Sequence, residues 1–249
     1  MQQASLSGKV ALITGGARRV GAAVCRALHA EGMNLVIHYR SSKADAHALQ
    51  NELQAARADS VLLVQGDLLN IAKVENLVQE TVNAHRRLDV LINNASSFYP
   101  TPVGEATEKQ WDDLVGTNFK APFFLAQAAA PFLKKTGGCI VNMVDIHADR
   151  PLKQYPIYSA AKAGLVMLTK ALARELAPEV RVNAIAPGTI LWPEQDMDEL
   201  TQQRILSKVP QKRSGDPQDI ARTLLFLVRD AGYINGQVIA VDGGRSVVA

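Results

Sequence analysis

A carboxylate, a phenol and an amine lie in the middle of the chain at a spacing that suits proton transfer. Asp145 ends an apolar run, and Tyr158 is followed four residues later by Lys162. If this stretch is helical, the phenol and the amine lie on one face of the helix. A neighbouring ammonium favours the phenolate and lowers a tyrosine's pKa from ~10, which predicts a proton donor or acceptor at Tyr158. Tyr155 is the weaker candidate, because a serine stands four positions after it.

The composition favours one α/β domain over residues 1–249. Of the 249 residues 47% are hydrophobic, the net charge is +3, and no basic run exceeds two residues. We therefore expect neither a nucleic acid nor a membrane as a partner. The short polar N-terminus and the lack of a long apolar run predict a cytoplasmic protein. Cys25 and Cys139 have no metal-ligand spacing, so we expect buried thiols and no metal site.

A glycine-rich turn lies between a strand pattern and a helix pattern near the start of the chain. The apolar residues 9–13 lead into Thr14, Gly15 and Gly21, and the helical pattern that follows stops at Gly32. In this context the N–H groups of the turn and the dipole of the helix N-terminus favour a phosphate. Arg19 stands where a dinucleotide fingerprint would have glycine. The alternative is a loop of an α/β protein that binds no nucleotide.

The end of the second strand pattern predicts the type of nicotinamide cofactor. An NAD site needs an acid there for the ribose 2′-hydroxyl. The strand at 34–39 is instead followed by the basic, hydroxyl-rich residues 40–43, and the first acid is Asp45. A guanidinium with hydroxyls fits a 2′-phosphate, so we predict NADPH rather than NADH. The alternative is a solvated basic turn.

Strand and helix patterns alternate along the chain, which predicts a parallel sheet with helices on both faces. Further strands are expected at 61–68, 88–96, 139–144, 180–188 and 237–244, and helices at 42–57, 71–85, 107–115, 120–134, 158–176 and 216–229. Residues 189–212 are predicted to be an irregular, mobile cover over the site. Because ligands lie beyond the carboxyl ends of such strands, the strand-end residues should converge: Thr14, Arg40, Asp67, Asn93 and Asp145.

An aromatic loop at 97–102 directly follows the fourth strand pattern. At the ligand-facing edge of the sheet, Phe98 or Tyr99 could stack on a flat ring. The alternative is an ordinary loop aromatic that covers apolar surface.

Over residues 9–244 the sequence resembles the short-chain dehydrogenase/reductase family. The markers, in chain order, are Thr14 and Gly15 with Gly21, then Asp67, Asn93, Asn94 and Ala95, Asn118, Tyr158 with Lys162, Pro187 and Gly188, and residues 241–244. The resemblance implies a doubly wound Rossmann fold and a nicotinamide cofactor. It also implies a homotetramer built through the helices after the fourth and fifth strands.

Three departures from the wider family resemble the pteridine reductases. Arg19 and Ser96 replace usual glycines, and Asp145 replaces a usual serine. Residues 38–41 and 93–102 resemble that subfamily too. This implies NADPH-dependent reduction of a dihydropterin, with dihydrofolate and oxidised pterins as further candidate substrates, by hydride transfer to a ring C=N carbon.

The resemblance also implies roles for individual residues. Asp145 would position Tyr158 and pass a proton through it. Lys162 would hold the ribose and tune the phenol, and Asn118 would orient Lys162 through water. Because a carboxylate raises the pKa of a phenol, Asp145 opposes Lys162, and the group should titrate as a coupled unit. His147 is expected to be structural.

The expected ligand-binding residues form two overlapping sets. Those for the cofactor are Thr14, Gly15, Arg18, Arg19, Val20, Gly21, Tyr39, Arg40, Ser41, Asp67, Leu68, Asn94, Ala95, Ser96, Tyr158, Lys162, Pro187 and Gly188; those for the substrate are Arg19, Ser96, Phe98, Asp145, Tyr155, Tyr158 and Leu191. Phe98 would sandwich the pterin against the nicotinamide, and Trp192 and Met197 would join Leu191 in a flexible wall.

Two other functions stay open at this point. One is a carbonyl reductase of the same fold, acting on a 3-ketoacyl or sugar substrate. The other is a non-catalytic module that binds NADPH and senses redox state. The sequence does not define the side chain of the pterin.

Overall fold

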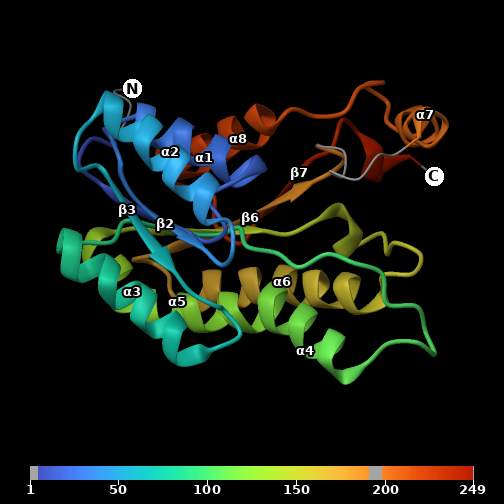
Figure 1. Ribbon diagram of the computed structural model, residues 1–249, viewed down its shortest axis with the longest axis horizontal. Coiled ribbons are helices and arrows are strands. Elements are labelled where there is room, and N and C mark those ends of the chain that lie inside the picture. The colour runs from blue at the N-terminus through green and yellow to red at the C-terminus, as the bar shows by residue number, and fades with distance from the viewer. Residues whose placement is uncertain (1–4, 191–197, 249) are drawn as a thin grey trace.

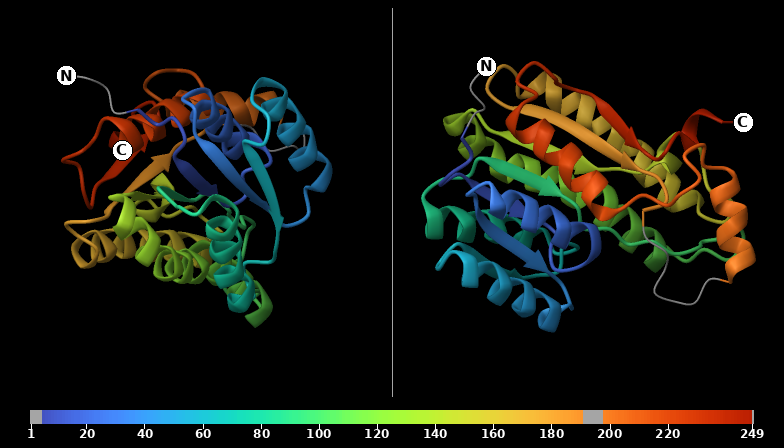
Figure 2. Two further views of the ribbon diagram at one scale, coloured as in Figure 1. Left: turned by 90° about the vertical axis from the view of Figure 1, so that its left-hand side faces the viewer. Right: turned by 90° about the horizontal axis from the view of Figure 1, so that it is seen from above.

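The computed structural model describes residues 5–190 and 198–248. Its centre is one parallel sheet of seven strands in the order β3-β2-β1-β4-β5-β6-β7 (Figures 1 and 2). The strands are β1 (Val10–Ile13), β2 (Asn34–Tyr39), β3 (Val61–Gln65), β4 (Val90–Asn93), β5 (Cys139–Met143), β6 (Arg181–Pro187) and β7 (Val238–Val241). The predicted α/β Rossmann fold is confirmed.

Helices cover both faces of this sheet, which explains why its central strands are almost continuously apolar. On one face lie α1 (Arg19–Ala30), α2 (Lys43–Ala56) and α8 (Pro217–Arg229); on the other lie α3 (Ile71–His85), α4 (Glu108–Val115), α5 (Ala121–Thr136) and α6 (Pro156–Glu175) (Figure 1). Each layer encloses a separate hydrophobic core against the sheet. Strand order reverses between β1 and β4, and the carboxyl ends at such a reversal form a crevice for ligands.

Local sequence signals fix several helix ends. Asp216 caps α8 in a capping box and Pro217 is its first residue, as predicted. A second capping box, formed by Thr107 and Gln110, starts α4, and α5 ends at Gly137, whose φ of 62° suits glycine. These caps orient α4 and α5 beside the crevice.

Several expected boundaries were wrong. The strands expected at 61–68, 88–96 and 237–244 are shorter, because their polar or glycine-containing ends leave the sheet. The long helix begins at Pro156 rather than Tyr158, because proline fits the first turn of a helix without losing a hydrogen bond. The helices around Asn118 do not break there; a π-helical turn, η1 (Gly116–Lys120), joins α4 to α5. Within the segment expected to be irregular, Asp198 caps a helix, α7 (Glu199–Ser207). Leu191, Trp192 and Met197, the predicted wall, lie outside the described residues.

Candidate functional site

A cavity of about 380 Å³ opens at the carboxyl ends of the strands near the reversal of strand order. Its lining includes most of the predicted cofactor residues: Gly15, Arg18, Arg19, Val20, Gly21, Tyr39, Arg40, Ser41, Asp67, Leu68, Asn94, Ala95 and Ser96. Ser42, from the hydroxyl-rich stretch predicted to suit a 2′-phosphate, also lines it. Ala17, His38, Ser97 and Thr117 line it too and were not predicted. The other predicted cofactor residues, Thr14, Tyr158, Lys162, Pro187 and Gly188, are not among its lining residues.

At Gly15 and Gly21 the glycine-rich turn leaves no room for a side chain. Gly15 has a φ of 60°, and a Cβ there would lie 2.9 Å from the Cα of Ala95. A Cβ on Gly21 would collide with the carbonyl oxygen of Gly15. Arg19, in the place of a usual glycine, keeps a glycine-like φ of 52°. Its backbone therefore preserves the turn while its side chain adds a cation to the lining.

Thr14 and Asn94 hold the turn onto β4. The amide of Asn94 donates to the carbonyl oxygens of Thr14 and Gly15, each at 2.9 Å. The hydroxyl of Thr14 accepts from the N–H groups of Asn94 and Ala95 at 3.0 and 3.1 Å. Thr14 is thus a buried residue that holds the turn in place, and it does not line the cavity. Asn93 likewise turns away from the crevice and donates to Asn142 at 2.8 Å inside the sheet, so the expectation that it joins the site was wrong.

His38 supports the same turn from below and was missed in the sequence. Its Nδ1 accepts from the N–H of Gly15 at 3.3 Å, and its Nε2 lies 3.1 Å from the carbonyl oxygen of Gly66. With both contacts made, the ring is neutral with the proton on Nε2. Burial lowers the pKa of His38, which keeps this state stable. A histidine within an apolar strand was the available signal.

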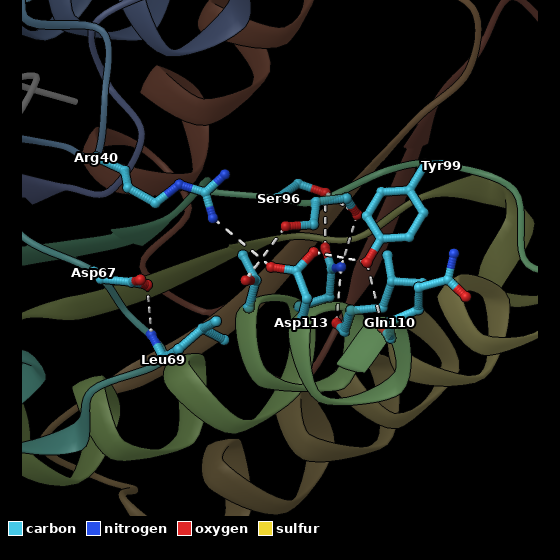
Figure 3. Close-up of polar contacts among 11 residues, drawn as sticks. Arg40, Asp67, Leu69, Ser96, Tyr99, Gln110 and Asp113 are labelled. Carbon is cyan, nitrogen blue, oxygen red and sulfur yellow. Dashed lines mark hydrogen bonds and ion pairs between the residues drawn. The ribbon is translucent and has the colours of Figure 1, made fainter. Parts of the chain in front are cut away.

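The strand end that was predicted to select NADPH presents Arg40 at the cavity (Figure 3). Its guanidinium is 56% exposed and lies 3.7 Å from a carboxylate oxygen of Asp113. Asp45, the first acid after the strand, is not among the cavity's lining residues; it lies 3.9 Å from Arg18. The rim of the cavity at this end is therefore cationic.

Tyr158 and Asp145 are in direct contact. The phenol donates to Oδ2 of Asp145 at 2.7 Å, while Oδ1 accepts from the N–H of His147 at 2.9 Å. The second contact caps the short 3₁₀ turn η2 (Ile146–Ala148) and fixes the direction of the carboxylate. Tyr155 carries no such contact, so the geometry distinguishes the two tyrosines as the spacing did.

Lys162 lies beneath the phenol in a fully buried position. Its Nζ donates to the carbonyl oxygen of Met143 at 2.8 Å and lies 5.8 Å from the centre of the Tyr158 ring. Burial lowers its pKa to about 8, against the opposing effect of Asp145. The pKa of Tyr158 is raised well above its usual value, first by burial and then by Asp145. The opposing effect expected from Asp145 is therefore confirmed, and the net shift of this phenol is upward rather than toward the phenolate.

Asn118, in the π-helical turn, is held by α4 and by the loop after β4. Its amide nitrogen donates to the carbonyl oxygens of Ser97 and Leu114, each at 2.9 Å. Its oxygen accepts from the hydroxyl of Ser96 at 2.7 Å. The turn η1 thus points a buried amide at Ser96, whose hydroxyl also lowers the pKa of Tyr158. Its link to Lys162 through water stays a prediction.

The aromatic loop places its two rings differently. Phe98 is half exposed, stacks on Tyr155 with ring centres 4.6 Å apart, and meets the edge of Tyr158 at 4.8 Å. Tyr99 instead donates to Asp113 at 2.9 Å (Figure 3). Phe98 is therefore the ring of this loop that contacts Tyr158.

Two further findings concern the described residues as a whole. Across residues 5–190 and 198–248, no three His, Cys, Asp or Glu side chains are grouped so that they could hold a metal ion. Among the helices of the same two segments, none is both long and apolar enough to pass through a bilayer.

Comparison with known proteins identifies the family. A family model described as enoyl-(acyl carrier protein) reductase matches residues 15–246. Pteridine reductase 1 of Leishmania tarentolae is 38% identical over 279 aligned residues, which cover 96% of each chain. A 3-oxoacyl-(acyl-carrier-protein) reductase of Staphylococcus aureus (strain Mu50) is also 38% identical, over 95% of this chain and 97% of the relative. Another, from Synechocystis, is 36% identical over 96% of this chain and 98% of the relative.

The chain therefore belongs to the short-chain dehydrogenase/reductase family. It is an oxidoreductase, and reductases of this type use NADH or NADPH. The glycine turn and the two arginines that follow it, Arg18 and Arg19, line the cavity at the N-terminus of α1, which fits the pyrophosphate of such a cofactor.

Proposed function

We propose that this protein is an NADPH-dependent pteridine reductase that converts dihydropterins to tetrahydropterins. The observation that carries the proposal is the 2.7 Å hydrogen bond from Tyr158 to Asp145. A carbonyl reducer uses a hydroxyl to hold the substrate's carbonyl oxygen. An ionised carboxylate cannot donate that hydrogen bond, but once it has taken up a proton it can pass that proton to the neighbouring phenol. Reduction of a C=N bond needs such a proton at nitrogen.

The proton path runs from Asp145 through Tyr158 to the ring nitrogen. NADPH, when bound, supplies a hydride to the adjacent carbon. Because burial and Asp145 raise the pKa of Tyr158, a free phenolate beside a carboxylate is disfavoured. For the transfer this hydrogen bond reverses: Asp145 takes up a proton from solvent and donates it to the phenol oxygen as Tyr158 gives its own proton to the ring nitrogen. No free phenolate forms, and Asp145 ends the step ionised. One hydride and one proton convert the C=N bond to CH–NH.

The remaining residues bind and orient the two reactants. The turn around Gly15 and the side chain of Arg19 would hold the pyrophosphate, and Arg40 with Ser41 would hold the 2′-phosphate. Phe98, stacked beside Tyr155 and Tyr158, would cover one face of the flat pterin. Ser96, bonded to Asn118, would donate to a ring heteroatom.

A second candidate is a 3-ketoacyl reductase, because two such relatives are as similar or nearly as similar as the pteridine reductase. The substrate panel that separates the two contains dihydrobiopterin, dihydromonapterin, dihydrofolate and an acetoacetyl thioester, each with NADPH and NADH. We expect turnover of at least one pterin, with NADPH preferred. Reduction of the thioester alone would refute the proposal, and tight NADPH binding without any turnover would favour a sensing module.

A further inference from the structure

One carboxylate contacts both Arg40, at the rim of the cavity, and the aromatic loop at 97–102. Asp113, on α4, lies 3.7 Å from Nη1 of Arg40 through Oδ1 and accepts from the hydroxyl of Tyr99 at 2.9 Å through Oδ2. Figure 3 shows these side chains meeting between the end of β2 and the last turn of α4. The two contacts come from segments that are predicted to bind different reactants: Arg40 the cofactor, and the loop of Tyr99 the substrate.

The two partners of Asp113 differ in how freely they can leave it. Arg40 is 56% exposed, whereas Asp113 is only 22% exposed. Tyr99 also donates to the backbone of Gln110, at 3.3 Å, and burial together with Asp113 raises the pKa of Tyr99 to about 12. The phenol is therefore a fixed, neutral donor. The guanidinium is the mobile partner, and it can rotate toward a ligand.

We propose that Asp113 is a specificity-determining residue that competes with the cofactor's 2′-phosphate for Arg40. The inference rests on the proposed use of NADPH. A 2′-phosphate that takes Arg40 must separate an existing ion pair and approach a second anion, which weakens its binding. NADH carries no such group and leaves the pair between Arg40 and Asp113 intact. Arg40 makes the affinity for NADPH higher than that for NADH, and Asp113 reduces this difference.

The movement of Arg40 from Asp113 to the phosphate also affects the loop that is predicted to bind the substrate. When Arg40 moves to the phosphate, Asp113 loses its neutralising cation and becomes a stronger acceptor for Tyr99. A carboxylate whose charge no cation balances is a stronger hydrogen-bond acceptor than one in an ion pair. The loop that carries Ser96 and Phe98 is then fixed more firmly in the NADPH complex than in the NADH complex. Specificity for the cofactor and affinity for the substrate are coupled through one side chain.

Calorimetric titration with 2′,5′-ADP and with 5′-AMP isolates the 2′-phosphate from the rest of the cofactor. We expect Asp113→Asn to tighten 2′,5′-ADP about fivefold, the size of a partly exposed charge interaction, and to leave 5′-AMP unchanged. High salt should reduce the difference. The exposed neighbour substitution Asp112→Asn is the control, because it changes net charge equally without touching Arg40, and it should leave both affinities within about twofold.

The outcomes separate this inference from the proposed function. If the unmodified protein prefers 2′,5′-ADP but Asp113→Asn does not tighten it, or tightens 5′-AMP equally, the inference is wrong and NADPH use stands. If the unmodified protein shows no preference for 2′,5′-ADP, both the predicted use of NADPH and the inference fail. Coupling is read separately from the dihydropterin KM with saturating NADPH: Tyr99→Phe should raise it with little change in kcat. An unchanged KM would show that the hydrogen bond from Tyr99 to Asp113 does not affect substrate binding, and the proposed coupling would be wrong.

Discussion

The substitution Lys162→Met should stabilise the cofactor-free protein at pH 7 while abolishing its activity. Lys162 is 2% exposed, and burial lowers its pKa from 10.5 to about 8. Since one pKa unit corresponds to ~1.4 kcal/mol, holding the charged amine in the folded state costs about 3 kcal/mol relative to the neutral amine. Against this gain, the variant loses the hydrogen bond to the carbonyl oxygen of Met143, which costs about 1 kcal/mol of stability. Methionine has a similar length, so the net gain in unfolding free energy is about 2 kcal/mol.

The pH dependence tests the cause of this gain. Because the unfolded lysine stays protonated up to 10.5 and the folded one only up to about 8, the unfolded state binds more protons between those values. The unfolding free energy of the unmodified protein should therefore rise with pH across this window. Lys162→Met should lack this rise, so its advantage should shrink and then reverse by pH 10.

Urea unfolding of the two proteins at pH 7 and pH 10, without cofactor, gives the required free energies. Lys170→Met is the matched control, since Lys170 lies exposed on the same helix and its loss should change stability by less than ~0.5 kcal/mol. Destabilisation by Lys162→Met at pH 7, or a difference that is the same at both pH values, would refute this account of the buried charge.

Two further predictions concern the glycine turn. His38→Phe removes the acceptor for Gly15 and the contact with Gly66, so the Kd for NADPH, measured by fluorescence titration, should rise about tenfold; an unchanged Kd would contradict a positioning role. Because burial lowers the pKa of His38, the unmodified protein should also lose stability as the pH falls below ~6.5, and His38→Phe should lose less. Gly21→Ala places a Cβ against Gly15 and should raise the KM for NADPH at least about tenfold, since the turn must move; a normal KM would show that the turn adapts.

The sheet, its helices and most residues that line the cavity could be predicted from the sequence, because their signals are local. Apolar runs, caps and a glycine turn each lie within about ten residues, and parallel strands bring their carboxyl ends to one edge. The pairing of Tyr158 with Asp145 needed only this edge and a helix. The upward effect of Asp145 on the Tyr158 pKa was predicted, but the larger effect of burial was not, because the depth of a side chain depends on the packed fold.

Other features depended on contacts between distant segments. His38 meets Gly15 through the register of β1 with β2, and Asp113 meets Arg40 across 73 positions of the chain. Neither pair has a sequence pattern that marks it. Asn118 was recognised as a polar interruption, but the π-helical turn that points it at Ser96 replaces an expected break. An extra residue in a helical turn leaves little trace in hydrophobic periodicity.

The central claim is that Asp145 directs this fold to ring C=N bonds, and the ratio of kcat/KM for a dihydropterin to kcat/KM for an acetoacetyl thioester measures it most directly. With Asp145→Ser, the pterin value should fall about 100-fold, the usual contribution of a positioned acid, while the thioester value holds or rises. Asp149→Ser, an exposed acid nearby, is the control and should change neither. If Asp145→Ser keeps its pterin activity, or loses both activities equally, Asp145 does not set the substrate class.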